Sequence, residues 1–130
     1  MKVYSSPASR IDFEPDKSLL RATWLESAKD LTPDEVKEEI THVFNFAKEF
    51  NIKRIIVDAR LYPFRENYDL QYWINFSFMP KIMDCEVEKY AIVIDQPITP
   101  KVESFYGKDS DFLQVEYFIR EEAALVWIEP

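Results

Sequence analysis

The chain has 130 residues, 47% of them hydrophobic and 15% aromatic, and a formal net charge of −8 at pH 7. This length suits one hydrophobic core, and the composition excludes a largely disordered chain. The negative charge and the lack of a basic block exclude nucleic acid as the expected partner, because phosphate binding relies on clustered Lys and Arg. We expect one domain over residues 1–130.

The N-terminal residues 1–7 contain no apolar run typical of a secretory signal. The sequence has no uninterrupted apolar stretch near eighteen residues, so we expect no membrane span. A cytoplasmic location is the default expectation.

A β-hairpin is predicted over residues 9–26. Residues 10–14 alternate with period two, and residues 18–25 form a second, more apolar run. The segment Pro15–Lys17 between them has turn chemistry, because proline presets φ and Asp16 can bond the following backbone.

An amphipathic helix is predicted over residues 33–50. Thr32 stands before Pro33 and three residues before Glu35, the pattern of a capping box. Apolar residues then recur at helical spacing until Asn51. The β-branched run within residues 53–58 follows at once and predicts a strand buried on both faces.

A second helix is predicted over about residues 70–79, after a loop over 59–68. Its circumference is apolar except for Gln71, Asn75 and Ser77, which requires cover on more than one side. Pro80 is expected to break or kink this helix, because proline removes a backbone donor and clashes with the preceding turn.

Two more strands and two more helices complete the chain. Residues 89–95 and 113–119 are the predicted strands; a short helix starts at Thr99 and ends near Gly107, and a closing helix covers residues 121–128. This alternation predicts an α/β fold with parallel strands joined by right-handed helical crossovers.

The chain resembles the STAS-like, SpoIIAA-like family within the STAS and CRAL-TRIO grouping, over roughly residues 10–128. The resemblance rests on Leu31–Glu35, Arg54–Arg60, Trp73 with Pro80, Lys89–Val93 and Tyr117–Ile128. It implies a mixed sheet of about five strands with helices packed mainly on one face. It also implies a bacterial, non-enzymatic protein that binds either a regulatory protein partner or a small hydrophobic molecule.

One feature of the family can be checked in the sequence. Anti-sigma antagonists of this fold carry a phosphorylatable Ser near the start of the helix after the central strand. Residues 59–76 contain neither Ser nor Thr. A partner switch through that phosphorylation is therefore not expected here.

A candidate polar loop site comprises Asp58, Arg60 and Asp95. Both aspartates follow predicted strands, where ligands bind in open α/β sheets, although Asp also ends strands routinely. Arg60 and Arg65 could bind an anion, but ion pairs with Glu66 or Asp69 are favoured.

Catalytic and metal-binding chemistry have little support in the sequence. The single cysteine, Cys85, excludes an internal disulfide framework and a multi-cysteine zinc site. His42 stands alone, away from the apolar stripe of its helix, and a lone histidine makes neither a metal site nor a triad. We expect no enzyme, no metal and no cofactor.

The aromatic side chains of the second helix, Tyr72, Trp73, Phe76 and Phe78, are the candidate interface or apolar-ligand site. Part of them should face the sheet, and the rest should meet a covering loop, a second copy or a ligand. The leading hypothesis is a regulatory module that binds an unidentified protein or forms a homodimer. The alternative is a carrier or sensor of a small lipid-like ligand.

Overall fold

The computed structural model describes residues 1–95 and 113–129, which form a mixed six-stranded sheet. Its strands are β1 (Lys2–Ser5), β2 (Ser9–Glu14), β3 (Leu19–Trp24), β4 (Arg54–Asp58), β5 (Lys89–Val93) and β6 (Gln114–Phe118). They lie side by side in chain order. β1, β2 and β3 are antiparallel neighbours, and β3 to β6 are parallel. The α/β class and the mixed sheet are therefore confirmed.

The strand beyond the expected five is β1, which pairs with β2 at the edge of the sheet. It has only four residues, and its register shifts between Lys2 and Tyr4. So short a segment shows too few period-two positions to stand out in the sequence. The hairpin of β2 and β3 lies where it was predicted, with Pro15–Lys17 as a short 3-10 turn between the strands.

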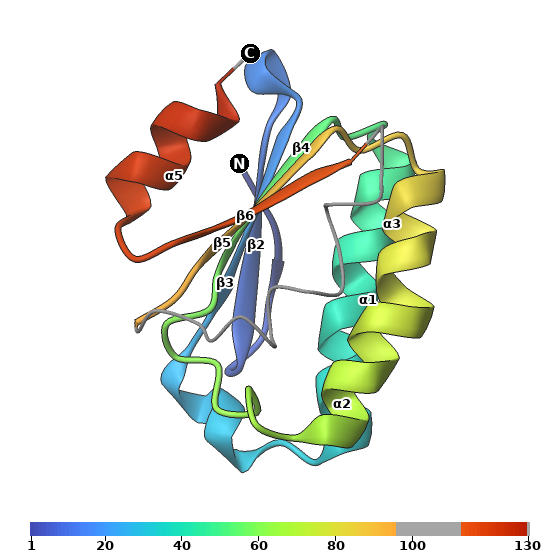
Figure 1. Ribbon diagram of the computed structural model, residues 1–130, viewed down its shortest axis with the longest axis vertical. Coiled ribbons are helices and arrows are strands. Elements are labelled where there is room, and N and C mark those ends of the chain that lie inside the picture. Colours follow the sequence, from blue (N-terminus) through green and yellow to red (C-terminus); the bar gives the residue numbers. More distant parts are fainter. Residues whose placement is uncertain (96–112, 130) are drawn as a thin grey trace.

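The first helix, α1 (Pro33–Glu49), begins with the predicted capping box. The Thr32 hydroxyl accepts a hydrogen bond from the Glu35 amide, and the Glu35 carboxylate accepts one from the Thr32 amide. Because strands β3, β4 and β5 follow one another in the sheet, right-handed crossovers place their connecting helices on one face. Figure 1 shows α1 and α3 together on that face.

The second helical segment corrects the expectation for Pro80. It runs without interruption through α2 (Tyr68–Trp73), a π-helical turn η3 (Ile74–Phe78) and α3 (Met79–Asp84). Proline clashes with the carbonyl of the fourth residue before it, here Phe76. The wider π turn ends at Phe78, two residues before Pro80, and the helix continues past the proline. The expected break is therefore wrong, and the irregularity in this helix takes the form of the π turn.

The closing helix α5 (Glu121–Ile128) covers the opposite face of the sheet, whereas the other described α-helices lie on the first face, in keeping with the expected arrangement of helices mainly on one face. A second apolar cluster lies beneath it and contains Leu19, Ile56, Ala91, Val93, Ala124 and Ile128. With helices on both faces, Ile55 and Ile56 of β4 are buried on opposite sides of the sheet, as predicted for this strand.

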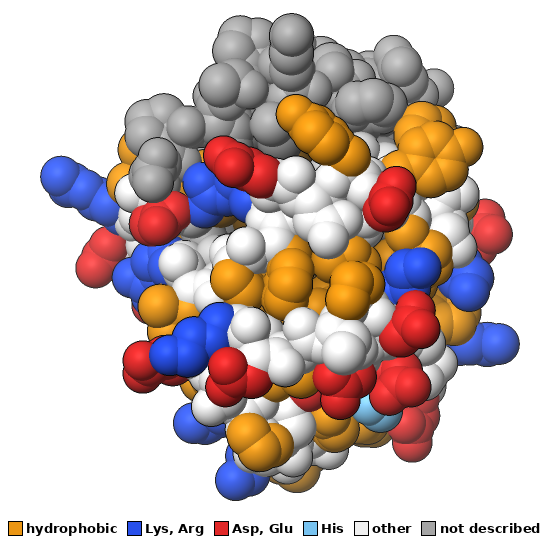
Figure 2. All heavy atoms as spheres, turned by 90° about the horizontal axis from the view of Figure 1, so that it is seen from below, with side chains coloured by type: hydrophobic (Ala, Val, Ile, Leu, Met, Phe, Trp, Pro, Cys, Tyr) orange, Lys and Arg blue, Asp and Glu red, His pale blue; other side chains and the backbone are white. Residues whose placement is uncertain are grey.

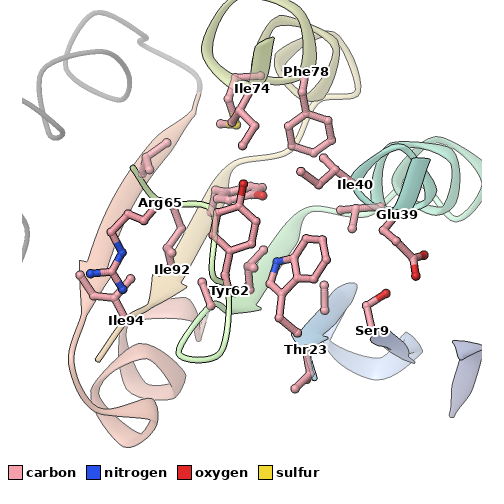
Figure 3. Close-up of a pocket in the computed structure, with 18 of the residues that line it drawn as sticks. Ser9, Thr23, Glu39, Ile40, Tyr62, Arg65, Ile74, Phe78, Ile92 and Ile94 are labelled. Atoms are coloured by element: carbon pink, nitrogen blue, oxygen red, sulfur yellow. The ribbon is translucent and has the colours of Figure 1, made fainter. Parts of the chain in front are cut away.

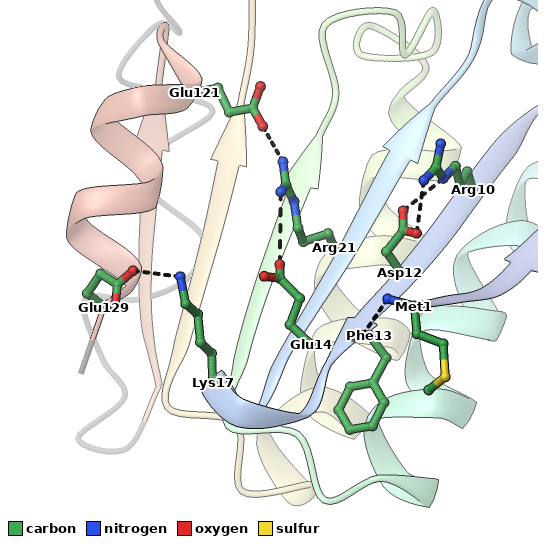
Figure 4. A network of polar contacts seen from close by, with 9 residues as sticks. All are labelled: Met1, Arg10, Asp12, Phe13, Glu14, Lys17, Arg21, Glu121 and Glu129. Carbon is green, nitrogen blue, oxygen red and sulfur yellow. Dashed lines mark hydrogen bonds and ion pairs between the residues drawn. The ribbon is translucent and has the colours of Figure 1, made fainter.

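Ion pairs connect α5 to the hairpin (Figure 4). Arg21 of β3 lies between Glu121 of α5, to which it hydrogen-bonds, and Glu14 of β2 at 3.9 Å. Lys17 at the turn pairs with Glu129 at 3.1 Å. The polar residues of the hairpin thus fix the last helix against the sheet.

Two further expectations concern helices. The predicted short helix from Thr99 to Gly107 lies outside the described residues. Among the helices that the structure does describe, none has the length and hydrophobicity needed to cross a bilayer.

Candidate functional site

A cavity of about 130 Å³ lies between the sheet and the helices α1 and α2–η3. It is lined mostly by apolar side chains from β2 to β6, α1 and the helical segment after residue 67 (Figure 3). The lining residues are Ser9, Ile11, Ala22, Thr23, Trp24, Glu39, Ile40, Val43, Val57, Ala59, Tyr62, Arg65, Gln71, Ile74, Asn75, Phe78, Met79, Tyr90, Ile92, Ile94, Val115 and Tyr117.

The cavity reaches the carboxyl-end edge of the parallel strands. Trp24 ends β3, Ala59 directly follows β4, and Ile94 directly follows β5; all three line it. This edge lies at the bottom of Figure 1, and Figure 2 views the molecule from that side. Hydrophobic side chains gather near the centre of this face, with charged side chains around them. Ligands of open α/β sheets bind at this edge.

Two buried hydroxyl groups in the cavity wall lack partners among the residues that the structure describes. Ser9 Oγ and the Tyr62 hydroxyl are both shielded from solvent, and neither has a hydrogen-bond partner within the described structure. Burial raises the pKa of Tyr62, and it also raises the pKa of Tyr90 in the same wall. Both tyrosines therefore stay neutral at physiological pH and offer polar O–H groups without charge.

The charged residues that line the cavity are engaged elsewhere. The Glu39 carboxylate accepts hydrogen bonds from the hydroxyls of Tyr4 and Ser6. Arg65 donates to Asp95 at 2.6 Å. Figure 3 shows Glu39 and Arg65 on opposite sides of the Tyr62 ring. The middle of the cavity is thus apolar, with neutral hydroxyls in its wall.

The four predicted aromatic residues do not form one site. Phe78 is 2% exposed and lines the cavity, and Trp73 is half-buried beneath the Lys37 ammonium, 5.8 Å from the ring centroid. Tyr72 and Phe76 are 66% and 52% exposed, and their ring centroids lie 4.6 Å apart. The first pair therefore faces inward and the second pair faces outward.

Of the predicted polar loop residues, Asp58 and Arg60 pair with each other, and Asp95 pairs with a different arginine. Arg60 donates to both carboxylate oxygens of Asp58, at 3.0 and 2.6 Å, and lies 3.6 Å from Glu121. Asp95 pairs with Arg65 instead. In the described part of the chain, Arg60 and Arg65 thus form ion pairs with partners other than Glu66 and Asp69, which the sequence favoured. Both aspartates lie at the carboxyl-end edge as predicted, each beside its own arginine.

The described residues offer little for nucleophilic or metal chemistry. They contain no group of three or more His, Cys, Asp and Glu side chains placed to hold a metal ion. Burial raises the pKa of the Cys85 thiol, which disfavours the reactive thiolate. The His42 ring stacks on Tyr4 at a centroid distance of 4.2 Å.

Sequence reasoning missed the polar side chains of the cavity wall. Ser9 carries a usable signal, because it shares the inward-facing, period-two positions of β2 with Ile11. Asn75 is one of the three polar residues on an otherwise apolar helix, and it is buried and lines the cavity. For Tyr62, which comes from a loop, no periodic pattern indicates where its hydroxyl points.

No protein-family model matches the chain, and neither a curated protein nor a solved structure shows significant similarity to it. Fold and site together define an α/β protein with a mostly apolar cavity at the carboxyl-end edge of its sheet.

Proposed function

We propose that this protein is a non-enzymatic binding module for a small, largely apolar ligand, and so a carrier or sensor rather than a catalyst. The observation that carries this proposal is the cavity behind Tyr62. Its volume of about 130 Å³ is close to that of an apolar protein cavity of ~150 Å³ that takes up benzene.

The test is calorimetric titration with benzene, comparing the wild type with two cavity-filling variants. Val43→Phe and Ile92→Phe extend into the cavity from α1 and β5. Val126→Phe is the control, because Val126 is 76% exposed on α5. We expect saturable binding to the wild type and the control, and at least about tenfold weaker binding to both filled variants. Equal affinity in all four proteins, or none in the wild type, contradicts the proposal.

A second candidate function is self-association through the outer face of α2 and η3. Tyr68, Tyr72 and Phe76 recur every fourth residue there and are all exposed. Aromatic residues are enriched in protein interfaces, and large exposed apolar patches mark such sites. Light scattering should then give a doubled mass that Tyr72→Asp abolishes and Val126→Asp leaves unchanged. A monomeric wild type at high concentration rejects this candidate.

We also propose that the chain is a member of the STAS-like family. In this proposal it is a bacterial, cytoplasmic protein that acts in regulation through an unidentified protein partner. The parallel strands with helical crossovers support it, as do the residues that carry the resemblance. Pull-down from a bacterial lysate with wild-type and Tyr72→Asp protein would test the regulatory partner.

A further inference from the structure

We infer that the ligand is a neutral molecule with an apolar body and one hydroxyl or carbonyl oxygen, which hydrogen-bonds to the Tyr62 hydroxyl. This inference rests on the proposed function and assigns the ligand class of the same cavity.

The Tyr62 hydroxyl is placed to make such a bond. Its oxygen is shielded from solvent and has no partner within the described part of the chain. Figure 3 shows the ring standing in the cavity with its hydroxyl directed toward Ile74. Trp24 and Phe64 pack on the ring, with centroid distances of 5.1 and 5.9 Å. The hydroxyl is therefore held at a fixed point before any ligand arrives.

Leaving this hydroxyl unpaired is unfavourable. A buried polar group without a partner lowers stability, and a ligand oxygen at hydrogen-bond distance removes that loss. A wholly apolar ligand fills the volume but leaves the hydroxyl unpaired. The cavity therefore discriminates in favour of a ligand with one polar atom.

The charged groups that line the cavity already have hydrogen-bond partners, which disfavours an ionic ligand. Glu39 is bonded to Tyr4 and Ser6, and Arg65 is bonded to Asp95. Burial keeps Tyr62 and Tyr90 protonated, because it raises the pKa of each. A carboxylate ligand would lose its hydration without gaining a free cation among the described lining residues, because Arg65 is paired with Asp95. An ammonium ligand would meet a Glu39 carboxylate that already accepts two hydrogen bonds and lies on the other side of the Tyr62 ring from Arg65.

The experiment is a calorimetric comparison of four probes of similar size: benzyl alcohol, ethylbenzene, benzoate and benzylammonium. Each is titrated into the wild type, Tyr62→Phe and Ser9→Ala. Tyr62→Phe keeps the packed ring and removes only the hydroxyl. Ser9→Ala removes the other unpaired hydroxyl, which Figure 3 places on the Glu39 side, away from the Tyr62 oxygen.

We expect benzyl alcohol and ethylbenzene to bind the wild type, and both ions to bind at least tenfold more weakly than benzyl alcohol. Tyr62→Phe should weaken benzyl alcohol by about 3- to 10-fold, the value of one net hydrogen bond, without weakening ethylbenzene. Ser9→Ala should leave the affinity for both neutral probes within about twofold, because neither probe has a second polar atom to reach Ser9.

Three results overturn the inference while leaving the proposed function intact. They are an equal effect of Tyr62→Phe on both neutral probes, benzoate or benzylammonium binding as tightly as benzyl alcohol, and loss of benzyl alcohol affinity in Ser9→Ala but not in Tyr62→Phe. Failure of every probe to bind the wild type, with benzene also failing, overturns the proposed function as well.

Discussion

The rings of Trp24 and Tyr62 pack against each other at a centroid distance of 5.1 Å and an interplanar angle of 41°. This contact joins the last residue of β3 to the loop after β4, and both side chains line the cavity. The indole therefore supports the Tyr62 ring, which stands in the cavity and carries the proposed hydrogen-bond donor.

Replacing Trp24 with Ala should destabilise the protein by about 3–5 kcal/mol, because Trp24 is only 8% exposed in the main core. Urea denaturation measures the loss. Trp73→Ala serves as the control, and its half-buried side chain predicts a smaller effect. An equal loss in both variants would contradict the prediction that the deeper burial of Trp24 makes its removal more costly.

Ser9→Ala should leave the stability of the ligand-free protein unchanged or raise it by up to about 1 kcal/mol, because the buried Ser9 hydroxyl has no described partner to lose. The matched variant is Ser6→Ala. The Ser6 hydroxyl accepts from the amides of Ala8 and Ser9 and donates to Glu39. Its removal should destabilise by about 1–3 kcal/mol in thermal or urea unfolding. The opposite ranking of the two variants would mean that Ser9 is hydrogen-bonded.

Thr32→Ala should lower the free energy of unfolding by about 1 kcal/mol, since the Thr32 hydroxyl caps the first turn of α1. Thr32→Ser keeps the hydroxyl and should stay close to wild type. Urea midpoints of the three proteins provide the comparison. A loss in Thr32→Ser as large as that in Thr32→Ala would contradict a capping role.

Ionisation of the Asp58 carboxyl should make the free energy of unfolding depend on pH. Its burial raises the pKa of the carboxyl, but hydrogen bonds and charge attraction from Arg60 together outweigh burial, and the pKa of Asp58 is lowered overall. A lowered folded-state pKa gives stability that is present above the unfolded value near 3.9 and lost as pH falls through the folded value.

The wild type should therefore exceed Asp58→Asn in unfolding free energy at pH 6, by less than about 1 kcal/mol because the Arg60 pair is partly exposed. The advantage should shrink as pH falls below about 4. Urea unfolding of both proteins between pH 6 and 2.5 measures the difference. An advantage that stays constant, or grows in acid, would be inconsistent with the lowered pKa.

Local signals in the sequence were sufficient where a single element determines the structure. The Thr32–Glu35 capping pattern located the start of α1, and the β-branched run at 55–57 located β4. Both depend on neighbouring residues alone, so no knowledge of the tertiary packing was needed. The α/β alternation followed from the order of such elements.

Local signals in the sequence failed where tertiary packing determines the structure. Pro80 indicated a helix break, but the π turn before it lets the helix continue. Tyr72, Trp73, Phe76 and Phe78 were grouped because they are neighbours in sequence, while the helix turns Phe78 inward and Tyr72 outward. The cavity combines residues from the sheet, two helical segments and a loop, and no sequence pattern indicates that Ser9 and Tyr62 line the same cavity.

The central claim, a ligand site between the sheet and α1, can be tested most directly by titrating benzyl alcohol into protein labelled at isoleucine methyl groups. Ile40, Ile74, Ile92 and Ile94 line the cavity, whereas Ile56 and Ile128 lie in the core on the opposite face. We predict saturable shifts of the first group's methyl signals with one common affinity, and unchanged signals from Ile56 and Ile128. Shifts that are absent, unsaturable or equal in both groups would contradict the account.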